Sequence, residues 1–120
     1  MLHDFMRLEA NIKRELSRVY KEIHGKGPDE TTVKIWENVV IIKLTASLTN
    51  IEETLRNSVK GDELIHKIFD ILIFEQQQQY IPLIEEILGT KVTAVNYSLG
   101  KEDNTLYLYA TLEECVAYSS

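Results

Sequence analysis

The chain has 120 residues, of which 44% are hydrophobic and 27% charged, and its net charge is -6 at pH 7. This length and composition exclude intrinsic disorder, and we predict a single domain over residues 1–120. The longest apolar runs fall far short of the roughly 20 residues that a membrane-spanning helix needs, so we expect no membrane insertion.

The N-terminal segment has the pattern of an amphipathic helix. Apolar residues from Leu2 to Ile23 recur every three or four positions, with Arg, Lys and Glu between them. Gly25 and Gly27 can adopt the left-handed conformation that ends a helix, and Pro28 cannot continue one. The predicted helix therefore ends just before these glycines.

Two short segments after this helix have the pattern of strands. Residues 32–36 alternate between polar and apolar, and residues 39–45 are mostly apolar and β-branched. Only Glu37 and Asn38 separate them, which predicts a hairpin. Glutamate is a poor residue for a turn position with positive φ, so the pairing register of the two strands is left undetermined.

Two helices are predicted next. Thr49 and Glu52 have the spacing of a capping box, which indicates a short helix from there to about Ser58. Residues 60–62 interrupt this pattern, and Asp62 is expected to cap a second, longer helix.

The second helix contains one proline and is followed by a glycine. Pro82 removes a backbone hydrogen bond, so we expect a kink or a restart there, and Gly89 is expected to end the helix. The run of glutamines at positions 76–79 is interpreted as a solvated face of this helix.

The apolar surface of this longer helix is too wide for a helix that is packed on one side only. Its apolar residues are Leu64, Ile65, Ile68, Phe69, Ile71, Leu72, Ile73 and Phe74. We therefore expect it to pack against a sheet and also against another helix or a second subunit. Phe69, Ile73 and Phe74 are the residues that we predict at such an interface.

Two further strands are predicted at residues 91–99 and 105–112, with a polar loop at residues 100–104. In the last strand, Tyr107, Tyr109 and Thr111 share one face, and the leucines and Ala110 share the other. We add Tyr107 and Tyr109 to the predicted interface. The element order αββααββ predicts an α+β two-layer sandwich, with a four-stranded antiparallel sheet and helices on one face.

One polar stripe could carry chemistry. Asp62, His66 and Asp70 are spaced four residues apart, so they project from one side of the longer helix and could bind a metal ion. The alternative is a solvated polar edge, which we favour because the HExxH and CxxC metal motifs are absent.

Other chemical functions have little support. The single cysteine, Cys115, follows two glutamates and not the basic residues that activate a thiol, so we expect no catalytic nucleophile and no enzyme. Basic residues of the first helix alternate with glutamates and the net charge is -6, so we expect no nucleic-acid partner. No cofactor is predicted. The lone cysteine and the lack of a secretory-signal pattern lead us to expect a cytoplasmic protein.

Several segments together resemble a known family. The segments Val19–Pro28 and Ile84–Val92, with Thr49 and Glu52 between them, resemble the DUF2294 family of small bacterial proteins. Members of this family are often labelled as the MpsC component of a Na+-translocating, membrane-potential-generating system. The resemblance implies a link to membrane transport of ions or inorganic carbon, and it implies no catalytic residues.

Our leading hypothesis is a non-enzymatic accessory or regulatory protein that acts by protein association. We expect a homodimer, with a protein of the membrane system as a further possible partner. The alternative is a protein that binds a metal ion or small molecule through Asp62, His66 and Asp70.

Overall fold

The structure is a computed structural model that describes residues 2–100 and 105–116, with side chains described from Phe5 onward. Its elements are α1 (Leu2–His24), β1 (Glu30–Trp36), β2 (Val39–Thr45), α2 (Asn50–Arg56), α3 (Val59–Leu88), β3 (Val92–Leu99) and β4 (Thr105–Leu112). The predicted α+β class and the order αββααββ are confirmed. Most of the predicted polar loop, residues 101–104, lies outside the described residues.

The strands form one antiparallel sheet in the order β1-β2-β4-β3. In the first hairpin Trp36 pairs with Val39, so the turn consists of Glu37 and Asn38. Glu37 adopts a positive φ of 54°, although glutamate seldom occupies this conformation. Because β4 pairs with both β2 and β3, the last strand of the chain lies inside the sheet.

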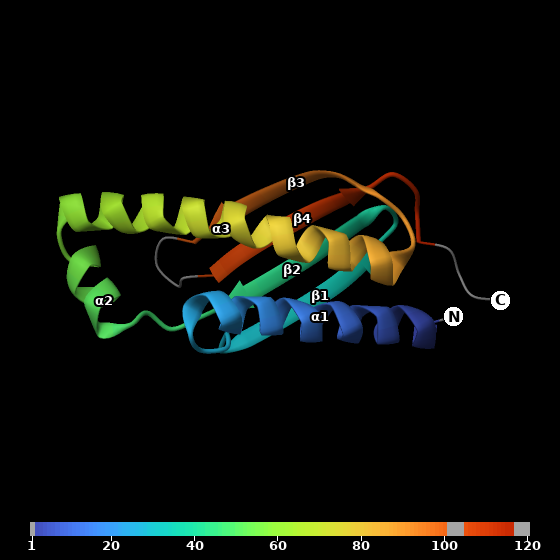
Figure 1. Cartoon of the computed structure of the whole chain (residues 1–120), viewed down its shortest axis with the longest axis horizontal. Coiled ribbons are helices and arrows are strands. Elements are labelled where there is room, and N and C mark those ends of the chain that lie inside the picture. Colours follow the sequence, from blue (N-terminus) through green and yellow to red (C-terminus); the bar gives the residue numbers. More distant parts are fainter. Residues whose placement is uncertain (1, 101–104, 117–120) are drawn as a thin grey trace.

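Helices α1 and α3 lie side by side over one face of the sheet, and no described helix covers the other face (Figure 1). Each strand turns alternate side chains toward these helices, which gives β2 and β4 their alternating burial. The core cluster between the layers includes Ile12, Leu16, Val40, Ile42, Tyr80, Ile84, Leu108 and Leu112. Each of the aliphatic side chains among them contributes roughly 1.5–3 kcal/mol by leaving water.

Helix α3 is longer than the sheet that it covers. At 30 residues it spans about 45 Å, and its N-terminal half extends beyond the strands and packs against α2 (Figure 1). The molecule is therefore elongated, with extents of 54 × 23 × 22 Å. Within the described residues, no helix is long and apolar enough to cross a membrane.

Two expectations about α3 are wrong. The helix begins earlier than predicted, because the hydroxyl of Ser58, not the Asp62 carboxylate, caps it by accepting a hydrogen bond from Gly61 N at 3.0 Å. The helix also continues through Pro82, so the restart expected there is wrong, and the kink that was its alternative stays a prediction. Pro82 and Gln78 are both exposed, so water can satisfy the Gln78 carbonyl that loses its partner.

The remaining helix ends carry local capping interactions. Glu52 N donates to Thr49 Oγ1 at 3.2 Å, and Thr49 N donates to Glu52 Oε1 at 2.9 Å, which forms a capping box at α2. Gly25 follows α1 with φ of 83°, and Gly89 follows α3 with φ of 70°. Gly27 and Pro28 lie in the connection to β1, and Gly27 has no positive φ.

Candidate functional site

A stripe of exposed apolar side chains runs along the outer side of α3. We define the α3 stripe as Leu64, Ile68, Ile71 and Phe74, whose side chains are 48%, 41%, 62% and 58% exposed. Residues three and four apart lie on one side of a helix, so the four side chains form a continuous surface. The opposite side of α3 holds the buried residues Ile65, Ile73, Gln76, Tyr80 and Ile84. Helix α3 therefore has two apolar faces, of which one is covered.

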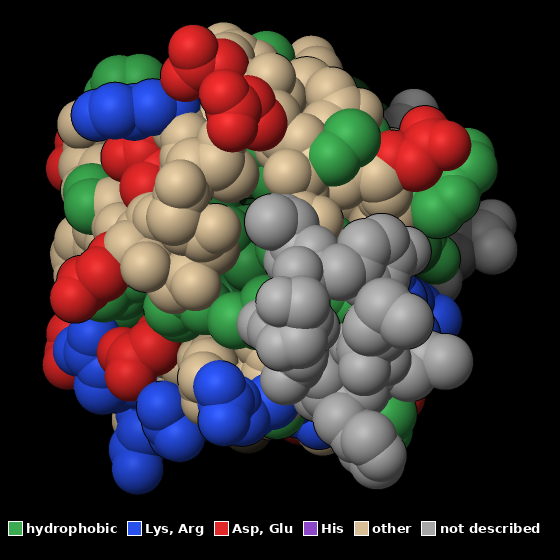
Figure 2. All heavy atoms as spheres, turned by 90° about the vertical axis from the view of Figure 1, so that its right-hand side faces the viewer, with side chains coloured by type: hydrophobic (Ala, Val, Ile, Leu, Met, Phe, Trp, Pro, Cys, Tyr) green, Lys and Arg blue, Asp and Glu red, His purple; other side chains and the backbone are tan. Residues whose placement is uncertain are grey.

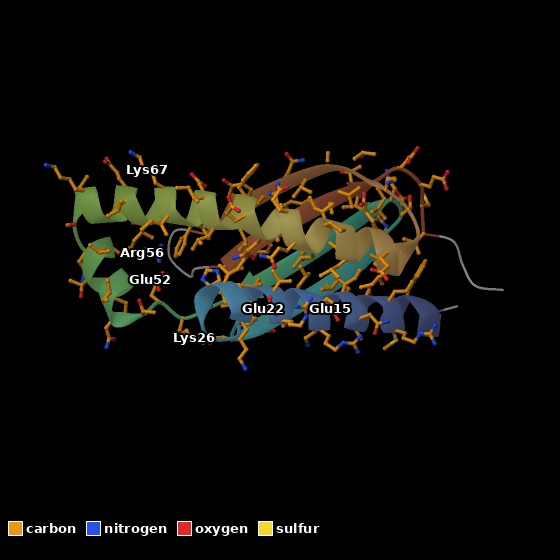
Figure 3. The ribbon with its side chains drawn as sticks, in the orientation of Figure 1. Glu15, Glu22, Lys26, Glu52, Arg56 and Lys67 are labelled. Atoms are coloured by element: carbon orange, nitrogen blue, oxygen red, sulfur yellow. The ribbon has the colours of Figure 1, made fainter. Side chains whose placement is uncertain are left out.

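Charged residues flank the centre of the α3 stripe. Lys67 and Glu75 are both exposed and lie four residues before and four residues after Ile71. Lys67 points away from the sheet and from α1 (Figure 3). The stripe thus carries a positive charge toward one end and a negative charge toward the other.

Two residues predicted at an interface lie elsewhere. Ile73 is 5% exposed and belongs to the core. The prediction that Ile73 lies at an interface is therefore wrong for the folded chain. Phe69 is half-buried and lines a cavity described below. Of the predicted α3 interface residues, only Phe74 belongs to the exposed stripe, because a difference of one position turns a helical side chain by about 100°.

The uncovered face of the sheet carries the two predicted tyrosines of β4. Tyr109 is 38% exposed and pairs with Ile41, and the half-buried Tyr107 pairs with Lys43. Trp36 is 64% exposed at the end of the edge strand β1. This face mixes aromatic side chains with an exposed lysine next to Tyr107, so it is less apolar than the α3 stripe.

The predicted metal ligands do not converge on one point. His66 Nδ1 lies 2.8 Å from the backbone oxygen of Asp62 and 3.7 Å from its carboxylate, which Arg56 also approaches at 3.8 Å. Asp70 instead accepts a hydrogen bond of 2.5 Å from the hydroxyl of Tyr97 on β3, and this bond raises the pKa of that tyrosine. In the described part of the chain, no group of three His, Cys, Asp or Glu side chains is placed to hold a metal ion.

A cavity of about 80 Å³ lies where the end of α1, the connection from β2 to α2 and the middle of α3 meet. Lys26, which follows α1, and Glu52 on α2 lie at this junction (Figure 3). Exposed Ser47 and Thr49 also line it. The apolar lining consists of Leu44, Ala46, Leu48, Phe69, Leu72, Ile73, Leu99 and Leu106.

A polar pair lies in the wall of this cavity. The Nε2 atoms of Gln76 and His24 are 2.7 Å apart, and the His24 ring stacks on Tyr20 with 3.9 Å between ring centroids. Burial lowers the pKa of His24 against an opposing effect of Glu52. Burial and the nearby Glu52 and Asp29 carboxylates raise the pKa of Tyr20 to about 12. Both rings are therefore neutral at pH 7.

No pattern in the sequence predicts this polar pair. Gln76 was interpreted as part of a solvated glutamine face, but it is 6% exposed and lies in the wall of the cavity. His24 was recognised only as a residue at the end of a helix. The two residues are 52 positions apart, so no local pattern links them.

Helix α1 carries both signs of charge. Figure 2 shows Lys and Arg side chains along the lower edge of one end of the molecule, with acidic side chains beside them. On α1, Arg18 forms ion pairs with Glu15 at 2.9 Å and with Glu22 at 2.8 Å, and these hydrogen bonds raise the pKa of Arg18. Part of the positive charge of α1 is therefore neutralised within the helix.

Comparisons with known proteins relate the chain to one family. The family model described as "Na+-translocating membrane potential-generating system (MpsC)" matches residues 6–114. Among curated proteins, the "Uncharacterized protein YrhF" of Bacillus subtilis (strain 168) is 26% identical over 90 residues, which make up 74% of this chain and 74% of that protein. No solved structure matches the chain significantly.

Proposed function

The chain belongs to the MpsC family, and from this premise we propose that it is a non-enzymatic accessory component of a Na+-translocating, membrane-potential-generating system. In this proposal it acts on the cytoplasmic side of the membrane by protein association, as a homodimer. The observation that carries the proposal is the α3 stripe, an apolar surface directly opposite the packed side of α3. Exposed apolar patches of this kind are typical of protein–protein interaction sites.

The charges beside the stripe favour a second copy of the same chain. A two-fold axis through Ile71 would pair two α3 helices antiparallel, so that residues equally far before and after Ile71 face each other. Lys67 of each copy would then face Glu75 of the other, and Ile68 would face Phe74. A parallel pair would instead bring each Lys67 toward its own twin, which is unfavourable.

The open face of the sheet is a weaker candidate for the dimer interface. Lys43 lies beside Tyr107 on that face and is exposed. Charged residues are depleted at the centres of protein interfaces, because removing them from water costs energy. A single helix pair buries a small area, so we expect a dimer of modest affinity, on the order of micromolar.

The dimer is tested by charge reversal at the flanking positions. The measurement is molar mass by analytical ultracentrifugation across a concentration series. Lys67→Glu and Glu75→Lys should each weaken the dimer about tenfold, because two attractive contacts become repulsive, each worth up to about 1 kcal/mol. The double variant carrying both changes should regain the affinity of the unmodified protein.

Lys91→Glu is the matched control, since Lys91 is exposed and lies outside α3. It makes the same change of charge and should leave the dimer constant unchanged. A monomeric wild-type protein at tens of micromolar would contradict the homodimer. A dimer that no reversal on α3 affects would contradict the α3 interface.

The role in the membrane system is tested in the native cell. Deleting the gene should lower the membrane potential in a Na+-dependent way, as measured with a potential-sensitive dye, and the wild-type gene should restore it. A gene carrying Ile71→Lys should restore it poorly, because a charge at the centre of the stripe disrupts association. An unchanged potential in the deletion strain at every Na+ concentration would contradict the proposed role.

A further inference from the structure

The cavity between α1, α3 and the β2–α2 connection has features that the proposed association does not use. It lies on the inner side of α3, where Ile73 and Gln76 line it, whereas the α3 stripe faces outward. Eight of its fifteen lining residues are apolar, and the other seven are polar or charged, among them His24 and Gln76. This combination is typical of sites that bind small molecules.

The polar groups of the wall can orient a ligand. A glutamine amide has two N–H donors and a carbonyl acceptor, and the contact with His24 engages one of its atoms. A neutral imidazole has a second ring nitrogen beyond the one that faces Gln76. Stacking on Tyr20 holds the His24 ring in place, so the pair presents its hydrogen-bonding groups in a defined direction.

We propose that this cavity binds a small neutral molecule with an apolar body and one hydrogen-bonding group, such as a hydroxyl, that contacts the His24–Gln76 pair. The cavity volume of about 80 Å³ holds about three non-hydrogen atoms, because a cavity of about 150 Å³ accommodates the six of benzene. A slightly longer ligand would extend from the cavity toward the exposed Ser47 and Thr49 of its lining. An ionised ligand is disfavoured, since the leucine side chains of the wall cannot replace its hydration. Lys26 and Glu52 in the lining carry opposite charges, so together they favour neither an anion nor a cation.

The proposal is tested with three probes of similar size: 1-butanol, which is neutral, butyrate, which is an anion, and butylammonium, which is a cation. Binding is followed by amide chemical shifts in two-dimensional NMR of the full chain. Butanol should cause saturable shifts confined to residues around the cavity. The two charged probes should bind at least tenfold more weakly.

Variants that fill the cavity provide the second part of the test. Leu72→Phe enlarges a side chain in the wall, and Ala46→Leu does the same from a different element, in case the first variant folds poorly. Both should abolish the saturable shifts. Ile51→Phe is the matched control, because it makes a similar enlargement at a residue of α2 that is 74% exposed and lines neither the cavity nor the α3 stripe.

The hydrogen-bonding group is tested by Gln76→Leu, which should weaken butanol binding severalfold while the filled variants lose it entirely. Equal shifts with all three probes, or shifts that persist in both filled variants, would overturn the site. The test of the cavity can be distinguished from the test of the dimer, because Lys67→Glu should weaken self-association and leave butanol binding unchanged.

Discussion

Replacing Tyr80 by phenylalanine should stabilise the protein. Tyr80 is 2% exposed within the core, and in the described part of the chain its hydroxyl has no hydrogen-bond partner. The same burial raises the pKa of this phenol. A buried hydroxyl without a partner costs roughly 1–3 kcal/mol relative to one in water. The substitution removes that cost and keeps the ring in its place.

The gain in the free energy of unfolding is reduced slightly by the empty space that the removed oxygen leaves. A void of a single heavy atom costs only about a few tenths of a kcal/mol at about 24 cal/mol per Å³. We therefore expect the free energy of unfolding to rise by about 1–2 kcal/mol. For a chain of this size the melting temperature should rise by about 4 °C for each kcal/mol.

The assay is urea denaturation followed by circular dichroism, at one fixed protein concentration because self-association adds to the apparent stability. Tyr80→Phe should raise the midpoint without changing the m-value. Tyr109→Phe is the control on the open face of the sheet and should change little. A loss of more than about 1 kcal/mol in Tyr80→Phe would refute the reasoning, since it would mean that the hydroxyl makes a favourable hydrogen bond.

Two further predictions concern the α2–α3 junction and the cavity wall. Gly61→Ala should lower the free energy of unfolding by more than about 2 kcal/mol in the same urea assay, because the added Cβ would clash with the backbone oxygen of Leu55. This loss is expected although alanine favours helices. Unchanged stability would mean that α2 can move away from α3. The lowered pKa of His24 means that the folded state disfavours its protonation, so stability should be full above about pH 6.5 and fall as the pH drops below it. In thermal melts at about pH 7.5 and about pH 5.5, His24→Gln should lose less stability than the wild type, and an equal loss would count against a role of His24.

The helix ends were predicted well where the capping interactions are local. Thr49 and Glu52 form their capping box within four residues, and Gly89 ends α3 through its own backbone conformation. The start of α3 was misplaced because Ser58 and Asp62 are both suitable caps. The close approach of Gly61 to Leu55 accompanies the earlier start, and this contact exists only once α2 packs on α3.

The exposed apolar surface of α3 was predicted in part. The excess apolar width of α3 is evident from the sequence, and the structure bears it out with four exposed side chains opposite the packed side. The direction of each side chain is not evident, because an apolar pattern on nearly every side of a helix does not tell which side meets the sheet. Phe74 and Ile73 are neighbours, yet one is 58% exposed and the other 5%.

By itself the sequence determined the order of the elements, the two faces of β4 and most helix ends, because periodicity and capping depend on residues within a few positions of one another. Only the tertiary structure decided that Gln76 is buried beside His24, that Asp70 faces Tyr97 and that a cavity remains under α3. These features depend on how distant segments pack. The free energy of that packing comes from contacts between residues far apart in the chain, so no short segment determines it.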